Sequence, residues 1–249
     1  MVKILKIELK GTKYIVTTED GEYKFTEDVI IKYIISKNKQ YSKEQFAEIV
    51  SFSNESMFYN KALKFLSYKD RSTHEVREYL ISKGCIDTKP ILNKLKDNKL
   101  LDDSRYALNM LESVIYNKKG PIYLKQQLIL KKISEELTNE MIEKYSYKQR
   151  MDNLNLLIDK ELGKRYVSSF KKYLNQLRSR LSRSGFKLNE INDVLSDRID
   201  EIKDNIDEDI SLLKEYQKLE SKDLPKHKLI AKLCGKGFDY QNVKNIVNK

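Results

Sequence analysis

One local signature occurs four times in this chain at nearly constant spacing. Each copy has two apolar residues four positions apart, followed by a glycine or a lysine and then by another apolar residue. The glycine-equivalent positions are Gly84, Lys132, Gly185 and Gly237, which lie 48, 53 and 52 residues apart. A pattern that recurs about every 50 residues is typical of a tandem array of small units. Because such units contact mainly their neighbours, an array exposes much surface and suits a long partner.

The signature describes a helix and its end. Apolar residues at positions i and i+4 lie on one face of a helix, and a glycine just beyond the last turn can adopt the left-handed C′ conformation. Lysine is less favourable there, so we expect the second copy to end differently at Lys132. The apolar pairs are expected in the cores of the units, and they are Val76, Leu80, Leu124, Leu128, Leu177, Leu181, Leu229 and Leu233.

Helix starts can be placed around each signature. Ser72 and Glu75 have the spacing of a capping box, and Asp102 or Asp103 is expected to cap the helix that follows. After the signatures, the expected N-caps are Thr88, Ser134, Asn189 and Asp239. These positions predict modules of three helices each, at 54–100, 101–146, 147–204 and 205–249, of which the last is diverged.

The segment 1–53 has a different pattern. Its stretches 2–9, 13–18 and 21–25 are rich in β-branched and aromatic residues and are separated by turn residues, which predicts a small β-meander. Two helices are expected after it, at about 27–36 and 43–53, and the second opens on a capping box at Ser42. The predicted fold is therefore mainly α: an elongated tandem array of three-helix modules, preceded by a small N-terminal sheet and two helices.

Charge is distributed unevenly along the chain, whose formal net charge is +11. The segment 163–189 has eight basic residues and no acid, and 114–134 has five lysines and no acid, whereas 190–209 has nine acids. Two acid-free stretches in equivalent parts of two modules favour a surface that meets a polyanion. Solvated helix faces without a partner are the alternative. The residues expected to make the contact are Lys118, Lys119, Lys125, Lys171, Lys172, Arg178, Arg180 and Arg183.

Aromatic residues are interleaved with these cations, and rings can stack on nucleic-acid bases. Aromatic side chains at helical spacing are more often part of a core, which is the expectation for most of Tyr123, Tyr166, Phe170 and Tyr173.

Catalytic constellations are missing from the sequence. The two histidines, His74 and His227, lack further residues at metal-ligand spacing, and the glycines do not form a phosphate-binding loop. Cys85 and Cys234 lie far apart, so no disulfide framework is implied. No apolar run approaches the length of a membrane span, and the N-terminus lacks a signal-peptide pattern. We therefore expect a cytoplasmic protein that is not an enzyme and uses no cofactor.

Several segments resemble the RecX family, which regulates the RecA recombinase. The stretch 71–84 resembles the signature of the family's first module, and 101–107 matches its Leu-Asp-Asp-x-x-Phe-Ala motif with Tyr106 in place of Phe. The stretch 120–128 resembles its Gly-Pro-x-x-Leu-x-x-x-Leu motif, and 183–186 its Arg-Arg-Gly-Phe, with Ser184 in place of the second Arg. The β-containing N-terminal segment resembles the extension of Firmicute members.

The resemblance implies a monomeric, non-catalytic regulator that binds RecA filaments on single-stranded DNA and most often inhibits their assembly, ATPase and strand exchange. Such a protein acts in homologous recombination, DNA repair and the SOS response. No residue role is carried over from the family. Two other classes stay open: a helical-repeat protein that binds DNA directly, and a helical scaffold whose basic faces only keep it soluble.

Overall fold

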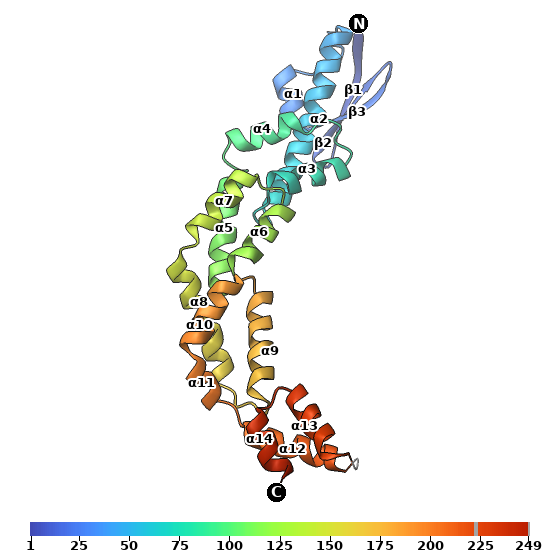
Figure 1. Cartoon of the computed structure of the whole chain (residues 1–249). Helices are drawn as coiled ribbons and strands as arrows, with labels where there is room; N and C mark the ends of the chain where they lie inside the picture. Colours follow the sequence, from blue (N-terminus) through green and yellow to red (C-terminus); the bar gives the residue numbers. More distant parts are fainter. Residues whose placement is uncertain (222–223, 249) are drawn as a thin grey trace. The chain divides into compact units, whose positions relative to one another are not determined.

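The computed structural model describes residues 1–221 and 224–248, and the chain divides into two compact units, 1–106 and 107–249. The fold is mainly α with one small antiparallel sheet near the N-terminus, as the sequence predicts (Figure 1). No helix of the described residues is both long and apolar enough to cross a membrane.

The sheet of the first unit has four strands. They are β1 (Val2–Lys10), β2 (Lys13–Thr18), β3 (Gly21–Phe25) and β4 (Gln40–Tyr41), in the order β3-β2-β1-β4. The first three form the predicted meander. The fourth was not predicted, because two residues that pair with Val2 and Lys3 are too few to carry an alternating pattern.

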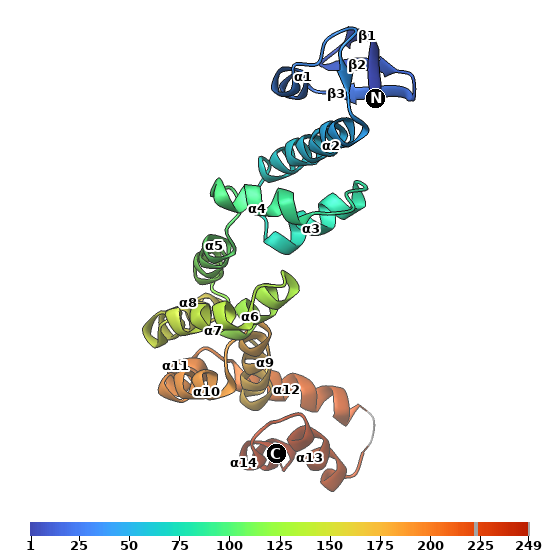
Figure 2. The ribbon, with the colours of Figure 1, turned by 90° about the horizontal axis from the view of Figure 1, so that it is seen from above.

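One long helix joins the sheet to the first predicted module. After the short helix α1 (Glu27–Tyr33), α2 spans Lys43–Leu66 and opens on the capping box predicted at Ser42. The helix was expected to end near residue 53. It continues because its first half packs on one hydrophobic core and its second half packs on another. Phe46 packs with the sheet and Ala62 packs in the next cluster along the chain. Figure 2 shows α2 alongside the sheet.

The rest of the first unit follows the predicted pattern of helices. The helix α3 (Thr73–Ser82) begins at the predicted capping box of Ser72 and Glu75, and α4 spans Lys89–Asp97. Thr88 is the N-cap of α4 as predicted, but its side chain makes no capping hydrogen bond. Their core contains the two signature residues of this module, Val76 and Leu80, both fully buried.

The regular elements of the second unit are all helices among its described residues. Its helices are α5 (Asp103–Tyr116), which begins at the end of the first unit, α6 (Pro121–Leu130), α7 (Glu135–Lys144), α8 (Tyr147–Leu162), α9 (Phe170–Arg183), α10 (Leu188–Asp197), α11 (Ile199–Asp204), α12 (Glu208–Glu220), α13 (Lys226–Gly235) and α14 (Tyr240–Val247). The range 147–204 therefore holds four helices and not the expected three. The additional α11 buries Ile202 in the core of this range.

The helix ends at the four signatures are alike. Gly84, Gly185 and Gly237 have φ angles of 86°, 91° and 93°, as predicted. The expectation that Lys132 would differ is wrong, because its φ is 54°, also in the left-handed region. Burial of the following Ile133, whose amide donates to the carbonyl of Leu128 at 3.1 Å, offsets the backbone cost.

Of the other predicted N-caps, Ser134 and Asp239 accept hydrogen bonds from backbone amides of the first turn. Asn189 is not an N-cap, because α10 begins at Leu188 and is preceded by Lys187. Asp102 accepts hydrogen bonds from the amides of two residues in the first turn of α5. Of the two candidates, Asp102 and not Asp103 is therefore the cap.

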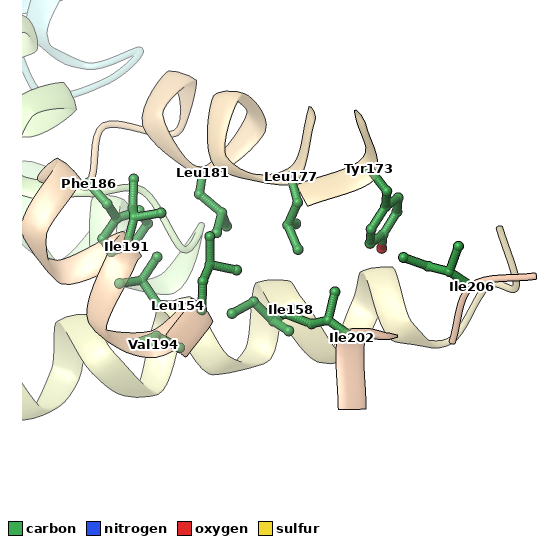
Figure 3. Packing of buried hydrophobic residues seen from close by; sticks show 11 residues of the cluster. Leu154, Ile158, Tyr173, Leu177, Leu181, Phe186, Ile191, Val194, Ile202 and Ile206 are labelled. Carbon is green, nitrogen blue, oxygen red and sulfur yellow. The ribbon is translucent and has the colours of Figure 1, made fainter. Parts of the chain in front are cut away.

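One hydrophobic core of the second unit lies among α8, α9, α10 and α11. Tyr173, Leu177 and Leu181 project from one face of α9 toward Leu154 and Ile158 of α8 (Figure 3). Because every third or fourth residue of α9 is used in this way, its opposite face is left for solvent or a partner.

Adjacent helices of the second unit are joined by backbone contacts at the glycine signatures. The amide of Gly120, the N-cap of α6, donates to the carbonyl of Ser184 at 2.8 Å, and the amide of Ile122 donates to the carbonyl of Gly185 at 2.9 Å. At the next such contact the hydroxyl of Ser169, the N-cap of α9, donates to the carbonyl of Lys236 at 2.7 Å. In both cases the start of one helix lies against the end of a later one.

Candidate functional site

The basic residues of α9 occupy two faces of that helix. Lys171, Lys172, Arg180 and Arg183 line a groove of about 890 Å³, whereas Arg178 lies outside it. Arg178 instead donates to the side-chain oxygens of Asn192 and Asn175, both at 3.0 Å. The structure thus brings four of the five predicted α9 cations together.

The groove lies between α9 and the segment that ends α13. One wall consists of the α9 residues spaced four apart along the helix, which places them on a single face. The other wall includes Gly235, Lys236 and Gly237 from the end of α13, and Ser211 and Glu215 from α12. The loop residues 167–169 also line it.

Lys236 was missed by the sequence interpretation, although it lies next to the fourth glycine signature. Its distance of more than 50 residues from α9 means that only the packing of α13 on the start of α9 brings it to the groove. That packing is close. A Cβ atom built on Gly237 would lie 3.0 Å from Oγ of Ser169 and 3.2 Å from Cβ of Lys171.

The cations of the groove differ in how far they are neutralised. Arg180 forms an ion pair with Glu161, whose carboxylate also accepts from the hydroxyl of Tyr166 at 2.9 Å. The interactions with Tyr166 and Glu161 raise the pKa of Arg180 above its ordinary value. Lys171, Lys172 and Arg183 are exposed. These three are the cations of α9 best placed to meet an external anion.

The three lysines predicted in module two do not line this groove. Lys118 follows α5 with a φ of 54°, and Lys119 is half-buried, while Lys125 is exposed on α6. The hydroxyl of Tyr145 donates to the carbonyl of Lys119 at 3.0 Å, and this fixes the backbone of the loop. The predicted stripe is therefore divided between the α5–α6 corner and the α9 groove.

The aromatic residues near the cations are mainly structural, as the sequence predicts. Tyr173 is buried, and Tyr166 and Phe170 pack partly buried against the same core. Tyr123 is half-buried beside Gly185. Burial raises the pKa of Tyr173 to about 12.

The first acid after the basic segment is not part of a solvated acidic face. Glu190 is 3% exposed, and its Oε1 accepts from Nε of Arg150 at 2.7 Å. Arg150 also donates to the carbonyl of Tyr145, so this pair ties α8 to α10 and to the end of α7. Glu190 is therefore a member of a buried ion pair inside the fold, and the charge that it contributes to the surface is small.

Comparison with known proteins agrees with the sequence signatures. A model of the first three-helix domain of RecX matches residues 59–87. The chain is 32% identical over 261 residues to the regulatory protein RecX of Streptococcus mutans serotype c, and the alignment covers 100% of this chain and 99% of that protein. This chain belongs to the RecX family. The regulatory protein RecX of Streptococcus gordonii is 29% identical over 262 residues, covering 99% of this chain and 98% of the relative.

Solved RecX structures have the same fold. A crystal structure of regulatory protein RecX covers 78% of this chain and 100% of its own, with a TM-score of 0.59 and 23% identity. The crystal structure of RecX from Lactobacillus salivarius covers 58% of this chain and 96% of its own, with a TM-score of 0.51 and 25% identity. The helical architecture is therefore that of RecX proteins.

Proposed function

We propose that this RecX-family chain is a non-catalytic regulator that binds the RecA recombinase on single-stranded DNA. Its most direct effect is to inhibit filament assembly, and with it ATPase activity and strand exchange. The observation that carries the proposal is the face of α9. In a chain of this family, Lys171, Lys172 and Arg183 lie exposed on one helix that has no acidic residue.

The chemistry of the site supports binding over catalysis. The groove holds lysine, arginine, hydroxyl and amide side chains, and its carboxylate, Glu215, is engaged by Lys218 and Lys236. Among the described residues, no group of three histidine, cysteine, aspartate or glutamate side chains is arranged to hold a metal ion. A cationic face increases the rate of encounter with a negatively charged filament and makes binding dependent on salt.

A titration tests this proposal. The chain is added to RecA that hydrolyses ATP on circular single-stranded DNA, and we expect the rate to fall as the chain is added. In a parallel sedimentation assay, the chain should pellet with RecA–DNA filaments. An unchanged ATPase rate, together with a chain that stays in the supernatant, would contradict the proposal.

The second candidate is a helical-repeat protein that acts on DNA directly. The α9 groove favours this alternative, because its cations do not need a recombinase to attract phosphate. The two functions differ in what RecA contributes. A regulator binds filaments more tightly than the same DNA without RecA, whereas a direct binder shows the same affinity for both.

A further inference from the structure

The groove beside α9 is lined by polar as well as charged side chains. Besides the cations, α9 contributes Asn175, Gln176 and Ser179, and the facing wall contributes backbone at Gly235 and Gly237. The groove therefore presents hydroxyl groups, amide groups and peptide backbone between its charged side chains.

The lining of the groove also carries a net positive charge. Among its described lining residues the one carboxylate is Glu215, which pairs with Lys236 across the groove and with Lys218 at 3.0 Å. Hydrogen bonds from Lys236 and Lys218 lower the pKa of Glu215, so it is ionised at neutral pH and holds Lys236. Lys171, Lys172 and Arg183 have no carboxylate at ion-pair distance within the described part of the chain.

This lining suits a phosphodiester chain better than an acidic segment of a protein. Centres of protein interfaces are enriched in aromatic and apolar anchors. Phe238 of the groove is only 6% exposed, and Val167 is the one exposed apolar side chain among the described lining residues. Phosphate oxygens are bound by lysine, arginine, asparagine and glutamine side chains, and the groove has all four. The amide of Gly237 and the hydroxyls of Ser169 and Ser179 already donate hydrogen bonds within the chain. Because none of the described lining residues is an exposed aromatic, bases have no ring there on which to stack.

We propose that the groove between α9 and the end of α13 binds the phosphodiester backbone of a single-stranded nucleic acid without reading its bases. This inference rests on the proposed function and deepens it, since it assigns to one site the strand on which a recombinase filament forms. Glu215 then acts as a counter-charge that limits the affinity.

The experiment uses the full chain without recombinase. Fluorescence anisotropy of a labelled oligothymidylate of about 20 nucleotides measures binding directly. If three or four cations meet phosphates, the slope of log K against log salt is about −2 to −3, and affinity falls roughly 20- to 50-fold between about 50 and 200 mM salt. Oligothymidylate and oligoadenylate should bind with affinities within about twofold, because the bases are not contacted.

Charge reversal locates the site. K171E/K172E/R183E should weaken binding at least about tenfold and flatten the salt slope. Both lysines lie in the first turn of α9, where glutamate is favourable to the helix dipole, so this variant should fold. The matched control changes the net charge equally at three exposed lysines outside the groove, and it is K148E/K160E/K187E.

Removal of the counter-charge tests the site in the opposite direction. Glu215→Gln frees Lys236, so affinity should rise at least about twofold and the salt slope should steepen by about 0.7. Equal weakening in the two triple variants, or tighter binding of a duplex or of a polyglutamate peptide than of the single strand, would overturn the inference. Because the assay contains no RecA, a chain that binds the strand but leaves RecA unaffected contradicts the proposed function alone. The reverse result contradicts this inference alone.

Discussion

Gly120→Ala tests whether the backbone contact between α6 and the Gly185 signature holds the second unit together. The φ angle of Gly120 is −86°, so alanine meets no conformational penalty there. Its Cβ, however, would lie 2.2 Å from the carbonyl oxygen of Gly185 and 2.4 Å from the amide nitrogen of Phe186, which are backbone atoms. The two segments must separate, and the hydrogen bonds from Gly120 and Ile122 across this contact must lengthen or break.

The expected cost can be worked from these contacts. Overpacking costs about 1–3 kcal/mol, and two weakened hydrogen bonds add about 0.5–1.5 kcal/mol each. We therefore expect about 2–6 kcal/mol, a large part of the stability of a domain. Urea unfolding followed by circular dichroism should show a transition shifted by about 1–2 M, given a typical urea dependence of the free energy.

Gly163→Ala is the matched control, because its Cβ would have neighbours no closer than 3.6 Å and its φ is −64°. It should be neutral or stabilise the chain by up to about 1 kcal/mol. If Gly120→Ala unfolds at the same urea concentration as the wild type, the close contact with Gly185 does not hold the unit together, and the argument is refuted.

Three further substitutions test separate features by the same unfolding assay. Lys132→Gly should stabilise the chain by about 0.5–1 kcal/mol, since glycine tolerates a φ of 54°, whereas Lys125→Gly within α6 should cost about 1 kcal/mol; a loss at both positions would contradict this. Arg150→Met should cost about 3–5 kcal/mol of stability, because it leaves Glu190 unpaired. Adding Glu190→Leu should restore most of the lost stability. No loss in Arg150→Met would show that the pair is only a surface contact. Tyr173→Phe should stabilise the chain by about 1 kcal/mol at pH 7, because the buried hydroxyl has no hydrogen-bond partner among the described residues.

The alkaline behaviour of Tyr173 provides a second measurement on the same variant. Its pKa in the folded chain is raised from 10 to about 12, so the folded state holds the phenolic proton more tightly than the unfolded state. The resulting stability is present below pH 10 and is lost as pH rises toward 12. The advantage of Tyr173→Phe over the wild type should therefore grow across this range. A constant advantage would show that the hydroxyl ionises as it does in water.

Local features of the fold could be predicted from the sequence. The capping boxes at Ser42 and Ser72 and the glycine helix ends depend on residues three or four positions apart, so a short stretch of sequence specifies them. Lys132 shows the limit of this approach. Its side chain disfavours the left-handed conformation, but burial of Ile133 against the helix outweighs that preference.

The candidate site could be predicted only in part, because its residues come from helices that are far apart in the sequence. Lys171 and Lys172 were found because they lie in one acid-free helix, but Lys236 comes from another helix that packs at the start of α9. Arg180 was expected to contact a polyanion, and no pattern along the chain indicated that Glu161, at the end of α8, would form an ion pair with it. Contacts of this kind depend on how helices pack, which a pattern along one helix does not contain.

The most direct test of the central claim compares two charge-reversed chains as inhibitors of RecA. Wild type, K171E/K172E/R183E and the control K148E/K160E/K187E are titrated separately into RecA that hydrolyses ATP on single-stranded DNA. We predict that the wild type and the control inhibit to the same extent, and that the α9 variant loses inhibition while unfolding at nearly the same urea concentration. Full inhibition by the α9 variant would contradict the claim that this face acts on the recombinase filament.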